Sequence, residues 1–161
     1  MNEEVRDLLV SKNMIEEEDA EVNKILNLPI PDTEKNQLVK ARIGQGIFRT
    51  RVEEIESRCR MTGVSDKRFL VASHIKPWRA SNNNERLDGN NGLLLSPHVD
   101  KLFDKGWISF SGAGRILCSN ETIQTIMKAW GLDINKNVGV FTIEQEKYLE
   151  YHRINIYQSN S

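Results

Sequence analysis

Two pieces of sequence decide how this chain folds: FLVASHIKPW at residues 69–78 and NGLLLSPHVDKLFDKGWISF at residues 91–110. The first begins with the apolar run Phe69–Ala72, and the second begins with the apolar run Gly92–Ser96. Both runs have the length and composition of short buried strands. Pro97 suits the first turn of a following helix, because that turn needs no N–H from its first residue. The predicted order is therefore strand, loop, strand, helix.

Helices are predicted before this centre. Residues 2–28 have the spacing of one or two short helices, which the prolines of segment 28–33 interrupt. A longer helix is predicted from Asp32 or Thr33 to about Ser57. The apolar residues that we expect to lie roughly on one face of it are Ile43, Ile47, Val52 and Ile55.

The loop between the two strands and the segments after the central helix also have recognisable patterns. Residues 79–90 are rich in asparagine and predict an irregular loop, and residues 107–118 predict a strand–turn–strand hairpin. One helix is predicted from Ser119 or Asn120 to Trp130. A last helix is predicted after Thr142, where Gln145 can complete a capping box.

Composition narrows the class of protein. The chain has 161 residues, enough for one domain with a modest core, and its two cysteines are too few for a disulfide framework. No apolar run approaches the roughly 20 residues that span a bilayer, and residues 1–10 lack the layout of a secretion signal. We therefore expect a cytoplasmic protein without a membrane partner.

Charge is unevenly distributed along the chain. The net charge is −1, but residues 1–40 hold ten acids and five bases, whereas residues 41–161 hold thirteen acids and seventeen bases. The longer part is therefore mildly basic, at +4, and the first part is acidic, at −5. This balance permits phosphate binding without predicting tight non-specific binding to DNA.

Three residue types in the central stretch match the needs of phosphodiester hydrolysis. His74 follows the first strand and has the intrinsic pKa of a general base near neutral pH. Asp100, with His98 beside it, can bind a divalent cation that neutralises charge on phosphate oxygens. Asn91, at the junction of loop and second strand, can bind backbone groups and fix the loop.

These strings resemble the HNH endonuclease family, in the branch of bacterial restriction-type nucleases. Segments 41–46 and 59–63 are similar to those that precede the motif in that branch, so the resemblance covers about residues 41–118. It implies an α+β fold with a ββα-metal core, a helical N-terminal segment, and a C-terminal hairpin and helices. It also implies a helical extension over residues 1–40 and a nuclease domain over residues 41–161, with its catalytic core at about 59–118.

The resemblance assigns roles to single residues. His74 matches the histidine that activates water, and Asn91 matches the asparagine that orients the loop. The third position falls on Asp100 by count and on His98 by residue type, so we expect Asp100 as metal ligand and His98 as second ligand or phosphate contact. Mg²⁺ or Mn²⁺ is the implied ion. The basic residues expected to contact double-stranded DNA are Lys76, Arg79, Lys101 and Lys105.

Two departures from the family pattern matter. Many relatives have an aspartate just before the first histidine, where this chain has Ser73. Many also have paired Cys-x-x-Cys motifs for a structural zinc, where this chain has Cys59 followed by Thr62 three residues later. We therefore predict no structural zinc.

The predicted function is metal-dependent cutting of DNA, in restriction or phage defence. Ser73 and the weak basic charge leave open a DNA-binding module with weak or no activity. The acidic N-terminal part leaves open an effector that a partner recognition subunit delivers to DNA. A homodimer is possible if both strands are cut.

Overall fold

A computed structural model describes residues 19–159 of the chain. Two compact units divide at Ile47 and Phe48, giving residues 1–47 and residues 48–161. Residues 19–26 are helical, and helix α2 then runs over Asp32–Ile55 as predicted. The part of the first predicted helices that falls in residues 2–18 lies outside the described residues.

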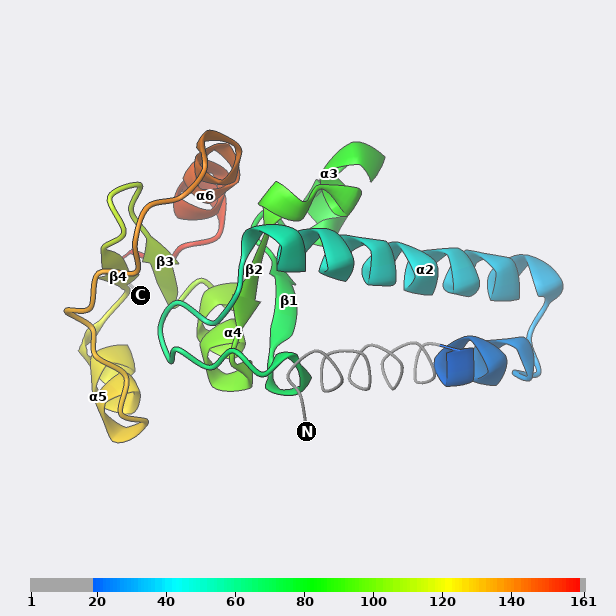
Figure 1. Cartoon of the computed structure of the whole chain (residues 1–161), viewed down its shortest axis with the longest axis horizontal. Coiled ribbons are helices and arrows are strands. Elements are labelled where there is room, and N and C mark those ends of the chain that lie inside the picture. Colours follow the sequence, from blue (N-terminus) through cyan, green and yellow to red (C-terminus); the bar gives the residue numbers. More distant parts are fainter. Residues whose placement is uncertain (1–18, 160–161) are drawn as a thin grey trace, which may run out of the picture. The chain divides into compact units, whose positions relative to one another are not determined.

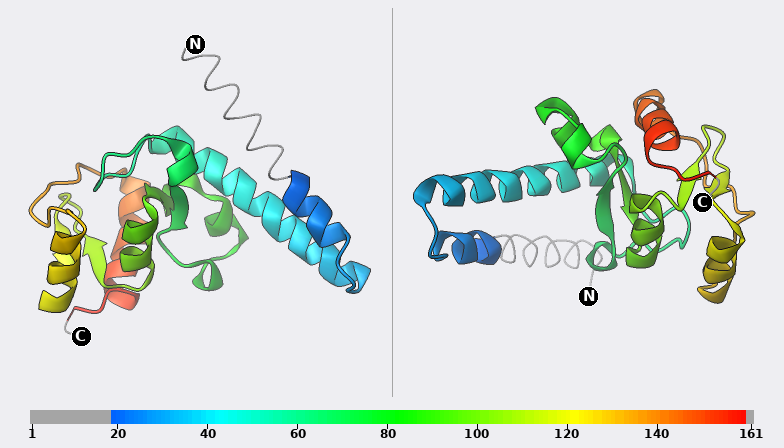
Figure 2. Two further views of the ribbon diagram at one scale, coloured as in Figure 1. Left: turned by 90° about the horizontal axis from the view of Figure 1, so that it is seen from below. Right: turned by 180° about the vertical axis from the view of Figure 1, so that it is seen from behind.

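The centre of the second unit is a strand pair covered by a helix. Strand β1 (Val71–His74) pairs antiparallel with β2 (Gly92–Leu95), with Val71 opposite Leu95 and His74 opposite Gly92. Helix α4 (Pro97–Asp104) packs against both strands, as Figure 1 shows and as Figure 2 shows from two further sides. This confirms the predicted strand, loop, strand and helix.

Strand β1 starts two residues later than the apolar run suggests. Residues Lys67–Phe69 form a 3-10 turn, η1, and the Asp66 side chain caps it by accepting a hydrogen bond from the Arg68 backbone N–H. Phe69 is 60% exposed on this turn. Phe69, the first residue of the apolar run, therefore belongs to the turn and not to the strand.

Strand β2 is covered on both faces. All four of its residues are buried, which is why its sequence is an unbroken apolar run and not an alternating one. A Cβ on Gly92 would lie 2.4 Å from Val52 Cγ2 and 2.6 Å from Phe48 Cζ. Glycine at this position therefore allows the last turns of α2 to approach the strand.

Of the predicted apolar face of α2, only Val52 is buried. The helix buries Phe48 and Val52, whereas Ile43, Ile47 and Ile55 are exposed. Phe48 and Val52 are four residues apart and so share one side of the helix. The buried residues of α2 are therefore those in the short segment that contacts β2.

The irregular loop predicted over residues 79–90 is also wrong in part. It contains the 3-10 turn η2 (Trp78–Ala80), the helix α3 (Asn83–Leu87) and the 3-10 turn η3 (Gly89–Asn91). Asn82 and Glu85 form a capping box that starts α3. A helix of five residues is too short to show apolar periodicity, so the sequence analysis did not predict it.

The predicted C-terminal elements are confirmed. Strands β3 (Ile108–Phe110) and β4 (Ile116–Cys118) form the antiparallel hairpin. Helix α5 (Glu121–Ala129) begins after its cap Asn120, and helix α6 (Ile143–Asn155) begins with the capping box of Thr142 and Gln145. Within residues 19–159, no helix is long and apolar enough to cross a membrane.

Candidate active site

His74 is the last residue of β1, and its ring is held on three sides. It stacks on Phe48 with 3.6 Å between ring centroids, and it meets the edge of Trp78 at 5.9 Å. Its Nε2 lies 3.0 Å from the Arg86 carbonyl oxygen. A carbonyl can only accept, so Nε2 is the protonated nitrogen and Nδ1 has the free lone pair.

The surroundings of His74 favour its neutral form. Burial lowers the pKa of the imidazole below its ordinary value, and the positive charge of Arg86 lowers it further. The hydrogen bond to the Arg86 carbonyl acts in the opposite direction and does not cancel the burial. A neutral imidazole with a free Nδ1 can accept a proton from water near pH 7.

Asn91 ties together the two ends of the loop that follows β1. Its side chain is fully buried, and its Oδ1 accepts a hydrogen bond of 2.8 Å from the Lys76 backbone N–H. Its Nδ2 donates to the Lys76 carbonyl at 3.3 Å and to the Glu85 carbonyl at 3.1 Å. Its own carbonyl accepts from the Ile75 N–H at 3.0 Å. The amide thus fixes the backbone next to His74.

Asp100 faces β1 from the first turn of α4. The side chain of Ser73, which is buried, is close enough to act on the Asp100 carboxylate. Burial raises the pKa of Asp100, the polar Ser73 side chain lowers it, and the negative charge of Asp104 one turn later raises it again. Asp100 is therefore a half-buried carboxylate whose negative charge is only partly compensated.

His98 lies elsewhere on α4. Its ring meets the edge of the Trp130 ring, with 5.3 Å between centroids and 88° between planes. Residues two apart on a helix do not share a side, and Asp100 points to Ser73. The structure therefore brings Asp100 and Ser73 together and leaves His98 apart from them.

The donor set at Asp100 has the chemistry of a hard cation with few protein ligands. Among residues 19–159, no group of three or more His, Cys, Asp and Glu side chains is placed to hold a metal ion. Mg²⁺ is often bound by one or two carboxylates and completes its shell with water and phosphate oxygens. The Asp100 carboxylate, with the Ser73 hydroxyl beside it, fits an ion of that kind.

The four predicted DNA contacts differ in availability. The Lys76 ammonium pairs with Glu85 at 2.8 Å and lies 5.0 Å from the centre of the Tyr151 ring. It is therefore engaged within the protein. The other three predicted DNA contacts, Arg79, Lys101 and Lys105, are exposed.

Sequence reasoning missed Arg86. Its Nε donates to the Trp78 carbonyl at 3.0 Å, and its guanidinium lies 4.5 Å from the centre of the Trp78 ring. Its charge acts on His74, and its carbonyl binds His74. No local signal identified it, because it stands in the segment predicted to be irregular.

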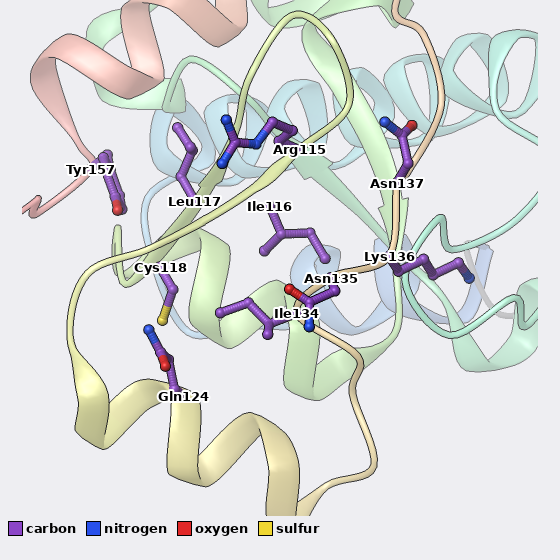
Figure 3. Close-up of a pocket in the computed structure, with 10 residues that line it drawn as sticks. All are labelled: Arg115, Ile116, Leu117, Cys118, Gln124, Ile134, Asn135, Lys136, Asn137 and Tyr157. Atoms are coloured by element: carbon purple, nitrogen blue, oxygen red, sulfur yellow. The ribbon is translucent and has the colours of Figure 1, made fainter.

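Two cavities are relevant to the location of the site. One of about 390 Å³ lies beside β4, α5 and residues 134–137, with Ile116 and Ile134 near its centre and Gln124 pointing toward Cys118 (Figure 3). None of the predicted site residues lines it. A second cavity, of about 360 Å³, lies between α6 and the loop after His74, and Lys76, Glu85 and Asp88 line its loop side.

Comparison with protein families decides what this arrangement is. The family model of the HNH endonucleases matches residues 59–111, about a third of the chain. Residues 59–111 therefore have the sequence of an HNH endonuclease domain. This domain contains β1, the loop, β2, α4 and β3, which are the elements that carry His74, Asn91 and Asp100.

The family assignment confirms the predicted resemblance and the α+β class of the fold. The match supports a nuclease enzyme in general terms. Helix α6 lies outside the residues that match the family model. No curated protein matches the chain.

Proposed function

We propose that this HNH protein is a metal-dependent endonuclease that hydrolyses double-stranded DNA. The single observation that supports this most is the state of His74. Its Nε2 is engaged with the Arg86 carbonyl, which leaves Nδ1 free to take a proton. The Asp100 carboxylate, in the first turn of α4, supplies the negative group that a cation needs.

In this mechanism the His74 Nδ1 removes a proton from water, and the resulting hydroxide attacks phosphorus in line with the leaving 3′-oxygen. Asn91 keeps the backbone next to His74 in place. The Asp100 carboxylate would hold a divalent cation, Mg²⁺ or Mn²⁺, which would supply positive charge to the phosphate and the leaving oxygen. The leaving 3′-oxygen takes a proton from solvent and His74 returns its proton to solvent, so the products carry a 5′-phosphate and a 3′-hydroxyl.

The basic residues have a separate task. Arg86 stands beside His74 and is oriented by Trp78, so we assign it a contact to the phosphate that is cut. His98 is assigned a phosphate contact on its own side of α4. The exposed residues assigned to the flanking DNA backbone are Arg79, Lys101 and Lys105. Lys76 would first have to leave Glu85.

The biological role that we propose is restriction or phage defence in the cytoplasm. Unit 1–47 contains the acidic part of the sequence, which suits a contact with a basic partner and not with DNA. If such a partner delivers the protein to DNA, we expect the isolated chain to cut DNA poorly.

A plasmid-cleavage assay tests the function. The native chain is incubated with Mg²⁺ or Mn²⁺ and compared with an EDTA control, with His74→Ala and with Asp100→Asn. Asp133→Asn serves as a matched control, because Asp133 is exposed and far along the chain, after α5. We expect cutting by the native and control chains and a loss of at least a hundredfold in His74→Ala, which is the usual contribution of a general base.

A second candidate function follows from Ser73. A hydroxyl stands beside Asp100 where many relatives have a second carboxylate, and this favours a weakly active or inactive DNA-binding module. DNA binding without cutting, in all metals and on both methylated and unmethylated plasmid, would select this function. Cutting that leaves a 3′-phosphate would contradict the proposed mechanism.

A further inference from the structure

Helix α6 lies outside the residues that match the family model, yet it packs against η3, the turn that ends at Asn91. This contact is not explained by the HNH motif itself. The cavity of about 360 Å³ has α6 on one side and the loop after His74 on the other. Two hydrogen bonds join these two sides.

The first of these bonds comes from a tyrosine. The Tyr148 hydroxyl donates to Asp88 Oδ2 at 2.7 Å. The other oxygen of that carboxylate, Oδ1, accepts from the Asn90 backbone N–H at 2.9 Å. Burial and the neighbouring carboxylate both raise the pKa of Tyr148, so its hydroxyl keeps the proton that it donates.

The second bond comes from Thr142, the N-cap residue of α6. The Thr142 hydroxyl donates to Asn90 Oδ1 at 2.9 Å. The same hydroxyl accepts from the Gln145 backbone N–H, which makes Thr142 the cap of α6 as well. The two bonds therefore end on Asp88 and Asn90, both within three residues before Asn91.

From η3 the connection to His74 is short. The Asn91 N–H donates to the Asp88 carbonyl at 2.9 Å, and the Asn91 side chain binds Lys76 and Glu85. The Arg86 carbonyl that binds His74 Nε2 is two residues before Asp88. A displacement of η3 would therefore move both groups that orient His74.

Helix α6 is itself fixed to the rest of the unit. Gln145 is fully buried and donates to Glu56 at 3.3 Å. His152 is buried and binds both Ser109 and the Phe103 carbonyl. A helix held at these two points is a firm support for the turn that it contacts.

We propose that Tyr148 is a positioning residue for the nuclease site, with Thr142 as its partner. It holds η3 through Asp88, so that Asn91 and the Arg86 carbonyl keep His74 oriented. Tyr148 does not touch the DNA in this role. The inference rests on the proposed function for its effect on catalysis, but the support of η3 can be measured without it.

The variant that tests this is Tyr148→Phe, which removes the hydroxyl and keeps the ring. Thr142 is less suitable because its substitution also removes the cap of α6. The matched control is Tyr157→Phe, since Tyr157 lines the other cavity. We expect kcat for plasmid cleavage to fall roughly tenfold in Tyr148→Phe, with KM within twofold and the control unchanged.

Amide hydrogen exchange supplies a readout that does not depend on cutting. The Ile75 and Lys76 amides donate to Asn91, so both should exchange roughly tenfold faster in Tyr148→Phe and at the native rate in Tyr157→Phe. Unchanged exchange overturns the proposal, whatever happens to kcat. Native kcat in Tyr148→Phe, with an active native chain, overturns it as well.

The failure of the two proposals can be told apart. If the native chain does not cut, the proposed function fails, and the exchange rates alone decide whether Tyr148 holds η3. If the native chain cuts and Asp88→Ala combined with Tyr148→Phe is no slower than Asp88→Ala alone, the tyrosine acts through Asp88 as proposed. Additive losses would contradict that path.

Discussion

Acid should destabilise this protein through His152, a histidine that has no part in the proposed chemistry. The side chain is 1% exposed and stacks on Phe103 with 3.9 Å between ring centroids. Its Nε2 donates to the Phe103 carbonyl at 2.9 Å, and its Nδ1 accepts from the Ser109 hydroxyl at 2.8 Å. Both nitrogens are satisfied in the neutral form, and protonation would remove the bond from Ser109.

The size of the effect follows from the pKa. Burial lowers the pKa of His152 to about 4, against an ordinary value of 6.5, and the Phe103 bond offsets only part of this. Between these two values the unfolded chain binds the proton and the folded chain does not. Stability is therefore complete above pH 6.5, falls as the pH drops toward 4, and loses about 3 kcal/mol in total.

Urea unfolding at pH 7.5 and at pH 4 measures this loss in the native chain and in His152→Gln, which cannot titrate. Carboxylates and the other histidines contribute equally to both chains, so the difference between them isolates His152. We expect the native free energy of unfolding to fall about 3 kcal/mol further than that of the variant. An NMR titration of the native imidazole gives a check that needs no variant. Equal losses in both chains, or a folded-state midpoint near 6.5, would refute the reasoning.

Three further outcomes are expected. Because the pKa of His74 is lowered, the acid limb of kcat/KM should have its midpoint below 6.5, and a pH–rate profile with a midpoint above that value would contradict the assignment of the base. Asn91→Ala leaves buried backbone groups without partners, so urea titration should show a loss of about 2–4 kcal/mol, together with a lower kcat. Gly92→Ala places a methyl group against Val52 and Phe48, so thermal unfolding should report a loss of about 1–3 kcal/mol, and native stability would show that α2 can yield.

Much of the HNH unit could be predicted because its signals are local. Pro97 at the start of α4, Asn120 before α5 and the Thr142–Gln145 box before α6 act within one turn of a helix. The run Gly92–Leu95 is apolar throughout because both faces of β2 are covered. Each of these features acts over a few residues, so the order of residues alone reveals it.

The sequence could not show which surfaces meet. It suggested a face of Ile43, Ile47, Val52 and Ile55 on α2, but the buried residues are Val52 and the unpredicted Phe48, which contact β2. Arg86 was not predicted because it acts through its own backbone carbonyl, which binds the ring of His74, a residue twelve positions earlier in the chain. These contacts join segments that are distant in the sequence, so no single segment predicts them.

The sequence by itself determined that this protein has a strand, loop, strand and helix of the HNH kind, with His74 and Asn91 at the two ends of the loop. Tertiary structure decided the rest: that Asp100 faces Ser73 while His98 meets Trp130, and that Lys76 is paired with Glu85. The physical reason is the range of the interactions. Turn and cap preferences are set by neighbouring residues, whereas burial, which controls both packing and the pKa of a histidine, is set by segments distant in the chain.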